Sequence, residues 1–133
     1  MATANRAELA ALVNTAIAAA KEAFNGAKPV PIRVVQHSNP LNDNSPVIRD
    51  YGVIEDGVCG FAWVNVRPAT SALARYLKDV GLARKSYYGG IEVSMGRFFA
   101  SQSLARNEAA ADAFAKVLRQ AGYDRVYSNS RMD

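Results

Sequence analysis

The first regular pattern along the chain is a stripe of apolar residues at helical spacing. The stripe consists of Leu9, Leu12, Val13, Ala16, Ile17, Ala20 and Phe24. Asn5 followed by Glu8 fits a capping box at its start. Asn25-Gly26 ends it, and Pro29 prevents its continuation. The pattern therefore predicts an N-terminal helix over residues 5–25.

The next segment changes from helical spacing to short extended runs. Residues 32–36 form a first apolar run, which leads into a loop from His37 to Pro46 that is rich in Asn, Ser and Pro. Ordered loops of this length without their own structure are often binding loops or lids. A mobile connection is the alternative, and both interpretations stay open.

Two strand patterns follow, over residues 51–55 and 58–67. They flank Asp56-Gly57, a dipeptide typical of two-residue β-hairpin turns, so we expect these strands to pair with each other. The second strand is apolar on both of its faces, with Ala62, Val64 and Val66 on one and Cys59, Phe61 and Trp63 on the other. A strand that is apolar on both faces is typical of the centre of a sheet covered on both sides.

The second half of the chain alternates between helix and strand patterns. Thr70 or Ser71 caps a second helix, which Gly81 ends, and Gly89-Gly90 introduces a strand over residues 91–95. Ser101 or Ser103 caps a third helix that runs to Gly122, and residues 125–128 form a last strand.

These elements predict one α+β domain over all 133 residues. We expect the N-terminal helix to be followed by a sheet-and-helix body over residues 32–128. The body is predicted to contain a mixed sheet of four or five strands with the three helices packed on it.

The sequence carries no recognisable catalytic or metal-binding pattern. His37 is the only histidine and Cys59 the only cysteine, so no metal-ligand spacing exists, and Cys59 is expected to be a small core residue. The glycines match neither a phosphate loop nor a dinucleotide fingerprint. We therefore predict no catalytic residues, no metal and no cofactor, and an enzyme is the least favoured interpretation. A single cysteine and no apolar run of bilayer length indicate a cytoplasmic protein without membrane association.

Charge is unevenly distributed along the chain. The net charge is +4, and it is concentrated in residues 67–85, where five cations stand against Asp79 alone. A concentrated basic segment favours an anionic partner, although a solvated helix face and loop would carry the same charges.

Two places have the residue types of an anion site. The stretch from Arg84 to Gly90 combines cations, tyrosines and glycines, which suit phosphate contacts and base stacking. The start of the third helix adds unpaired backbone N–H groups, hydroxyls and a cation, although capping alone would also explain its residues. The candidate anion-binding residues are Arg67, Arg75, Lys78, Arg84, Lys85, Tyr87, Tyr88, Gln102, Ser103, Arg106 and Arg131.

Several short elements between Gly60 and Asp133 carry a resemblance to known proteins. They are Gly60-Phe-Ala-Trp-Val64 with Pro68, Tyr88-Gly-Gly90, Gln102-Ser103 with Arg106, Ala113-Phe-Ala-Lys-Val-Leu118 and Ser130-Arg-Met-Asp133. In these elements the chain resembles small tailed-phage proteins to which no activity is attached. The resemblance implies a phage or prophage origin, and hence the host cytoplasm.

These observations lead us to expect a small phage accessory protein that binds an anionic partner, either nucleic acid or a nucleotide, without catalysis. The second interpretation is a protein that inhibits a host enzyme or defence complex, with residues 37–46 as a contact element. A virion or assembly protein is the third. A homo-oligomer is compatible with all of them.

Overall fold

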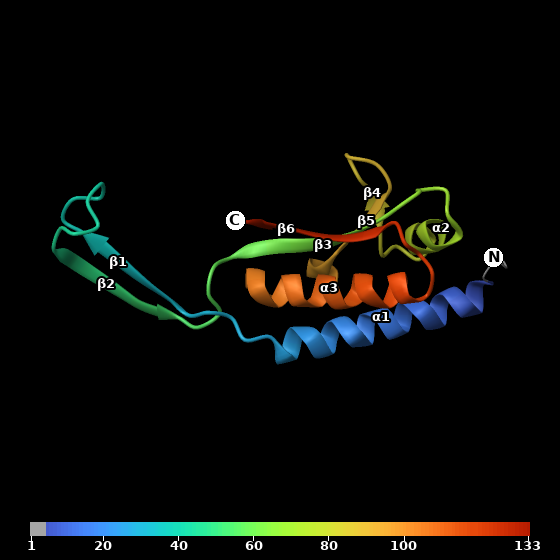
Figure 1. Cartoon of the computed structure of the whole chain (residues 1–133), viewed down its shortest axis with the longest axis horizontal. Helices are drawn as coiled ribbons and strands as arrows, with labels where there is room; N and C mark the ends of the chain where they lie inside the picture. The colour runs from blue at the N-terminus through green and yellow to red at the C-terminus, as the bar shows by residue number, and fades with distance from the viewer. Residues whose placement is uncertain (1–4) are drawn as a thin grey trace.

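A computed structural model describes residues 5–133, which form three α-helices and six strands. Two of the strands form a separate hairpin that extends away from the rest of the molecule, the body (Figure 1). In chain order the elements are α1 (Arg6–Gly26), β1 (Ile32–His37), β2 (Val47–Ile54), β3 (Gly60–Val66), α2 (Ala72–Asp79), β4 (Arg84–Lys85), β5 (Ile91–Ser94), a 3-10 turn η1 (Met95–Arg97), α3 (Leu104–Gln120) and β6 (Val126–Met132).

The body contains a four-stranded sheet in the order β4-β5-β3-β6. The predicted α+β class and single domain are confirmed, but the sheet is antiparallel throughout rather than mixed. The reason lies in its connections. Each helical crossover, β3-α2-β4 and β5-α3-β6, passes over one strand, so its two parallel strands are never neighbours.

The core lies between this sheet and α3. Ala62, Val64 and Val66 alternate along β3 and are buried, as the two-residue period predicts. Val93 of β5 and Phe114 of α3 are fully buried in the same core. These side chains all project from the same side of the sheet. Helices therefore cover the sheet on that side only.

α1 packs on α3, on the side of α3 that faces away from the sheet (Figure 1). Its buried residues are Leu9, Val13, Ala16 and Ala20, which belong to the predicted stripe. The expectation that all three helices pack on the sheet is thus wrong for α1. The predicted capping box is present, since the Glu8 N–H donates to Asn5 Oδ1 at 2.8 Å. Ser71 and Ser103 cap α2 and α3 in the same way.

The second face of the sheet is open, which corrects the prediction that β3 is covered on both sides. Phe61 is 42% exposed and Trp63 is only half-buried. Cys59, expected in the core, is also exposed. The apolar residues on this side of β3 predict a second layer, but α1 packs on α3 instead of on this face.

The predicted hairpin around Asp56-Gly57 is wrong. β2 pairs with β1 instead, from Ile32 opposite Ile54 to His37 opposite Val47, and residues 38–46 form the tip. A tight turn does form here, but Glu55 and Asp56 are its central residues, because Gly57, with a φ of 72°, donates its N–H to the Ile54 oxygen. That turn redirects the chain from the hairpin into the body, because β2 has already found its partner upstream.

We call the β1–β2 hairpin and its tip, residues 32–54, the arm. Arg33 of β1 and Asp50 of β2 form an ion pair across its strands. Hydrogen bonds from Arg33, and then from the Gly52 N–H, lower the pKa of the Asp50 carboxyl. Asp50 is therefore ionised at neutral pH, and the arm carries no net charge, with Arg33 and Arg49 balanced by Asp43 and Asp50.

Because helices cover only one face of the sheet, we predict different effects for two phenylalanine substitutions. Phe114→Ala should lower the free energy of unfolding by about 3–5 kcal/mol, because it leaves a cavity in the core. Phe61→Ala, the matched change on the open face, should cost about 1 kcal/mol or less. Urea unfolding followed by circular dichroism measures both. Equal losses would contradict the open face.

Candidate functional site

The open face of the sheet is lined by residues that the strand registers place side by side. Phe61 stands opposite Arg131 and Trp63 opposite Asn129, while Trp63 also stands opposite Ser94 of β5. Directly opposed residues in an antiparallel pair project to the same face. The face therefore consists of Phe61, Trp63 and Asn65 from β3, Tyr127, Asn129 and Arg131 from β6, Glu92 and Ser94 from β5, and Arg84 from β4.

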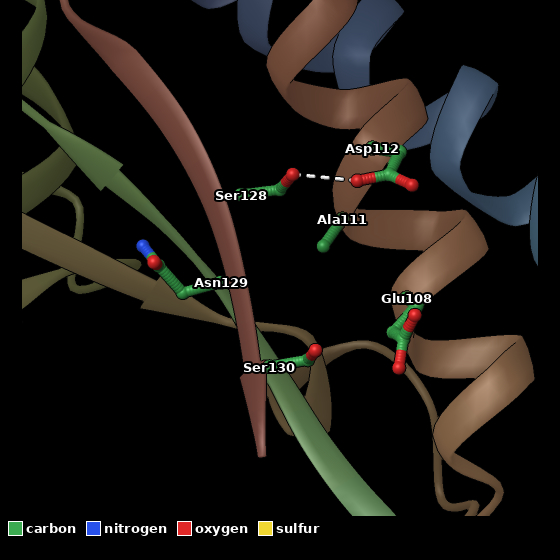
Figure 2. Close-up of a pocket in the computed structure, with 6 residues that line it drawn as sticks. All are labelled: Glu108, Ala111, Asp112, Ser128, Asn129 and Ser130. Carbon is green, nitrogen blue, oxygen red and sulfur yellow. Dashed lines mark hydrogen bonds between the residues drawn. The ribbon is translucent and has the colours of Figure 1, made fainter.

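Figure 2 shows this alternation along β6. Ser128 and Ser130 point toward α3, whereas Asn129 points to the other side of the strand. Tyr127 and Arg131, two residues before and after Asn129, project to the same side as it does. The polar residues of β6 thus divide between the helix side and the open face.

A hollow of about 430 Å³ lies on the open face. Phe61 and Trp63 form its floor on β3, and Tyr87 and Tyr88 border it from the β4–β5 turn. Its other lining residues are Arg84, Ser86, Glu92, Ser94 and Arg131. The hollow therefore combines aromatic rings, hydroxyls, two cations and one carboxylate on one accessible surface.

The β4–β5 turn holds two tyrosines away from the protein surface. Tyr87 is 93% exposed and Tyr88 81%, and their rings meet edge to face with centroids 5.0 Å apart. Gly90 makes the turn fit, since a Cβ there would lie 2.6 Å from the Val66 oxygen and its φ is 70°. Rings this exposed contribute little to the core, so packing does not explain their position.

Arg67 holds the β4–β5 turn in place through hydrogen bonds. Its Nη2 donates to the Tyr88 oxygen at 3.0 Å and its Nε to Asn65 Oδ1 at 2.8 Å. Asn65 in turn donates from Nδ2 to the Gly89 oxygen at 3.0 Å. Arg67 therefore positions the tyrosines and places its positive charge beside them.

The two cations of the hollow differ in how they are neutralised. Arg84 Nε lies 2.7 Å from Glu92 Oε1, so this arginine is paired. The Arg131 guanidinium lies 5.8 Å from the centre of the Phe61 ring. Within residues 5–133 no carboxylate lies in ion-pair range of Arg131, so its charge faces solvent uncompensated.

The other cations of the basic segment do not reach the open face. Arg75 and Lys78 are exposed on α2, whose buried side carries Leu73 and Leu77. Lys85 stands opposite the buried Ile91 and so projects to the helix side, whereas its neighbour Arg84 stands opposite Glu92. Of the cations in residues 67–85, Arg84 lines the hollow and Arg67 binds the backbone of the turn that borders it.

The start of α3, the second predicted anion site, is engaged in internal bonds. Ser103 is buried, and its hydroxyl caps the helix while donating to the Asp56 oxygen at 2.9 Å. Arg106 donates to Asp56 Oδ1 and to the Phe24 oxygen, each at 3.0 Å. These bonds hold α1, the base of the arm and α3 together. Gln102 has an exposed side chain and accepts the Gly60 N–H on its backbone oxygen.

A second, smaller hollow of about 280 Å³ lies between α3 and β6 and has the opposite electrostatic character (Figure 2). Glu108 and Asp112 line it from α3, and Ser128 donates a hydrogen bond to Asp112. Two carboxylates disfavour an anionic ligand. Three metal-ligating side chains do not gather anywhere in residues 5–133.

Sequence reasoning missed Phe61, Trp63, Asn65, Tyr127 and Asn129 as site residues. The signal was the alternation itself. Residues 127–131 place Tyr127, Asn129 and Arg131 at every second position, a pattern typical of a solvent-facing sheet surface. Only the strand pairing shows that this pattern lies beside Phe61 and Trp63.

Comparison with known proteins adds no relative. No protein-family model matches the chain, and neither curated proteins nor solved structures give a significant match. None of the helices between residues 5 and 133 has the length and apolar content that crossing a bilayer requires.

The bonds of Arg106 predict a structural role for this residue. Arg106→Gln should lower the free energy of unfolding by about 1–3 kcal/mol, because it removes two charge-assisted hydrogen bonds from a largely covered side chain. Arg119→Gln, which removes one bond to the Val126 oxygen, is the matched comparison and should cost less. Chemical denaturation checks both, and an unchanged midpoint for Arg106→Gln would contradict this role.

Proposed function

We propose that the protein binds single-stranded nucleic acid across the open face of its sheet. The observation that carries the proposal is the grouping of Phe61, Trp63 and the unpaired Arg131 on one exposed surface, bordered by Tyr87 and Tyr88. Aromatic side chains on an exposed sheet stack unpaired bases, and neighbouring cations contact the phosphates.

Single strands fit this surface better than duplexes. A base must be unstacked to lie flat on Trp63 or Phe61, which a single strand allows at little cost. A duplex reader instead needs a helix or ribbon that enters a groove. The open face presents flat rings and the short β4–β5 turn, so stacking is the interaction that it supports.

The expected affinity follows from the number of rings. Stacking contributes about 1–3 kcal/mol per base. Three stacked bases on Trp63, Phe61 and the tyrosine pair then provide about 3–9 kcal/mol, whose upper part corresponds to micromolar dissociation constants. Because the surface carries few cations, we expect moderate rather than tight binding.

A phage accessory role is consistent with this proposal. Among the elements that resemble small tailed-phage proteins are those with Phe61, Trp63, Tyr88 and Arg131, which are residues of the open face or its border. We therefore propose that the protein handles single-stranded nucleic acid in an infected host cell, without catalysis.

Trp63 provides the first test, because it is the only tryptophan and lies in the proposed site. Titration with ten-nucleotide single-stranded RNA or DNA should quench its emission and saturate at micromolar concentrations. A duplex of the same sequence, and mononucleotides, should quench it far less. No change with either single strand would refute the proposal, and saturation by a mononucleotide alone would assign a nucleotide site instead.

Arg131 and Arg75 form a matched pair for the electrostatic contribution. Arg131→Gln should weaken oligonucleotide binding and lower the slope of log K against log salt by about 0.7, the value for one phosphate contact. Arg75→Gln removes the same charge from α2, away from the open face, and should leave the slope unchanged. Fluorescence anisotropy at several salt concentrations measures this, and equal effects of the two changes would contradict binding on the open face.

A further inference from the structure

The arm has a high density of exposed apolar side chains. Val47, Ile48, Tyr51, Val53 and Ile54 are all exposed on β2, so five of its eight residues offer apolar side chains to solvent. Figure 1 shows the arm extending beyond the body, with its two strands paired with each other. A two-stranded hairpin alone is marginally stable in water, so the arm gains from being covered.

One edge of β2 is free for strand pairing. β2 pairs with β1 on one side, and no strand pairs with its other side. Residues 47–54 contain neither lysine nor proline, two residues that often protect an edge, although bulges at Ile48 and Tyr51 interrupt the strand. β1 is shorter and follows Pro29 and Pro31. The free edge of β2 is therefore the better template for an additional strand.

The charges of the arm favour a neutral occupant. Its two arginines are balanced by two aspartates, Arg33 is paired with Asp50, and Arg49 lies over the Tyr51 ring. Nucleic acid, or a strongly charged protein surface, gains nothing from such a surface. The β2 edge is better matched by a strand of similar length with no net charge and several apolar side chains. The β2 strand of a second copy meets this description.

An exposed leucine at the tip of the arm and a hollow at its base make pairing between two arms specific. Leu41 at the tip is 96% exposed. At the base lies a largely apolar hollow of about 260 Å³, lined by Pro29, Val30, Ile32, Val58 and Leu104 among others. When two β2 strands pair antiparallel, the tip of each arm reaches the base of the other. Twofold symmetry then places each Leu41 near the hollow of the partner copy.

From these observations we infer that the protein forms a twofold dimer through its arms. The β2 edges pair antiparallel, and Leu41 of each copy occupies the hollow at the base of the other arm. The interface consists of one strand pair and two apolar contacts, so it is small and should dissociate in the micromolar range. This inference does not rest on the proposed nucleic-acid function, since the open face takes no part in it.

Sedimentation velocity over a range of protein concentrations tests the dimer. The unaltered protein should shift from monomer to dimer as its concentration rises. Ile48→Lys should raise the dissociation constant about tenfold or more, because a lysine on the edge opposes strand pairing. Val80→Lys, the matched change of an exposed apolar residue at the end of α2, should leave it unchanged. A monomer at all concentrations, or equal effects of the two variants, would overturn the inference.

Disulfide cross-linking in a Cys59→Ser background tests the arrangement of the arms. Chains with Leu41→Cys, mixed with chains that carry Val30→Cys, should form the mixed disulfide dimer on mild oxidation, because tip and base meet. Leu41→Cys chains alone should not cross-link, since antiparallel pairing keeps the two tips apart. Cross-linking of Leu41→Cys chains to each other, or no mixed product, would exclude the proposed geometry.

Discussion

The packing of α1 on α3 determines which surfaces of this protein remain available. α1 buries Leu9, Val13, Ala16 and Ala20, and the small alanines allow a close approach to α3. Because its apolar stripe is buried against α3, α1 has no second apolar stripe that could pack on the open face of the sheet. The helices therefore stack in two successive layers on one side, and the other side of the sheet faces solvent (Figure 1).

This one-sided arrangement has an energetic consequence. Phe61 and Trp63 keep apolar ring area in contact with water, at about 25 cal/mol for each Å² left uncovered. Arg131 over Phe61 and the hydrogen bonds of Asn65 give the face polar neighbours, but these leave the rings accessible. A stacked base would recover that free energy. The same exposure that reduces folding stability thus supplies the driving force for binding.

Sequence patterns predicted the elements well and their partners poorly. The stripe from Leu9 to Phe24, the cap at Asn5, the starts of α2 and α3 to within two residues, and the buried side of β3 depend on neighbours close in sequence, so local spacing reveals them. The pairing of β2 with β1, the packing of α1 on α3 and the grouping of Trp63 with Arg131 depend on contacts distant in sequence. Asp56-Gly57 illustrates the difference, since the chain does turn there, but the turn is centred on Glu55 and Asp56 and the strands on either side of it do not pair with each other. The sequence predicted the cations and tyrosines of the candidate site, Arg67, Arg84, Tyr87, Tyr88 and Arg131, but not the aromatic residues on β3, because strand register brings these together.

The arm and the open face complement each other when the dimer is considered as a binding unit. The eight residues of β2 stand opposite six of β1, because β2 carries two bulges, so the strand is about 20 Å long. Antiparallel pairing of two such strands puts the two bodies at opposite ends of the joined arms, separated by at least about that length. A short oligonucleotide occupies one open face and gains nothing from the dimer. A strand long enough to span the arms reaches both faces, and the second contact becomes intramolecular, with an effective concentration set by the length of the strand between them. Two faces of moderate affinity then hold a long single strand firmly while they release short fragments, which is a form of length selectivity that neither surface provides alone.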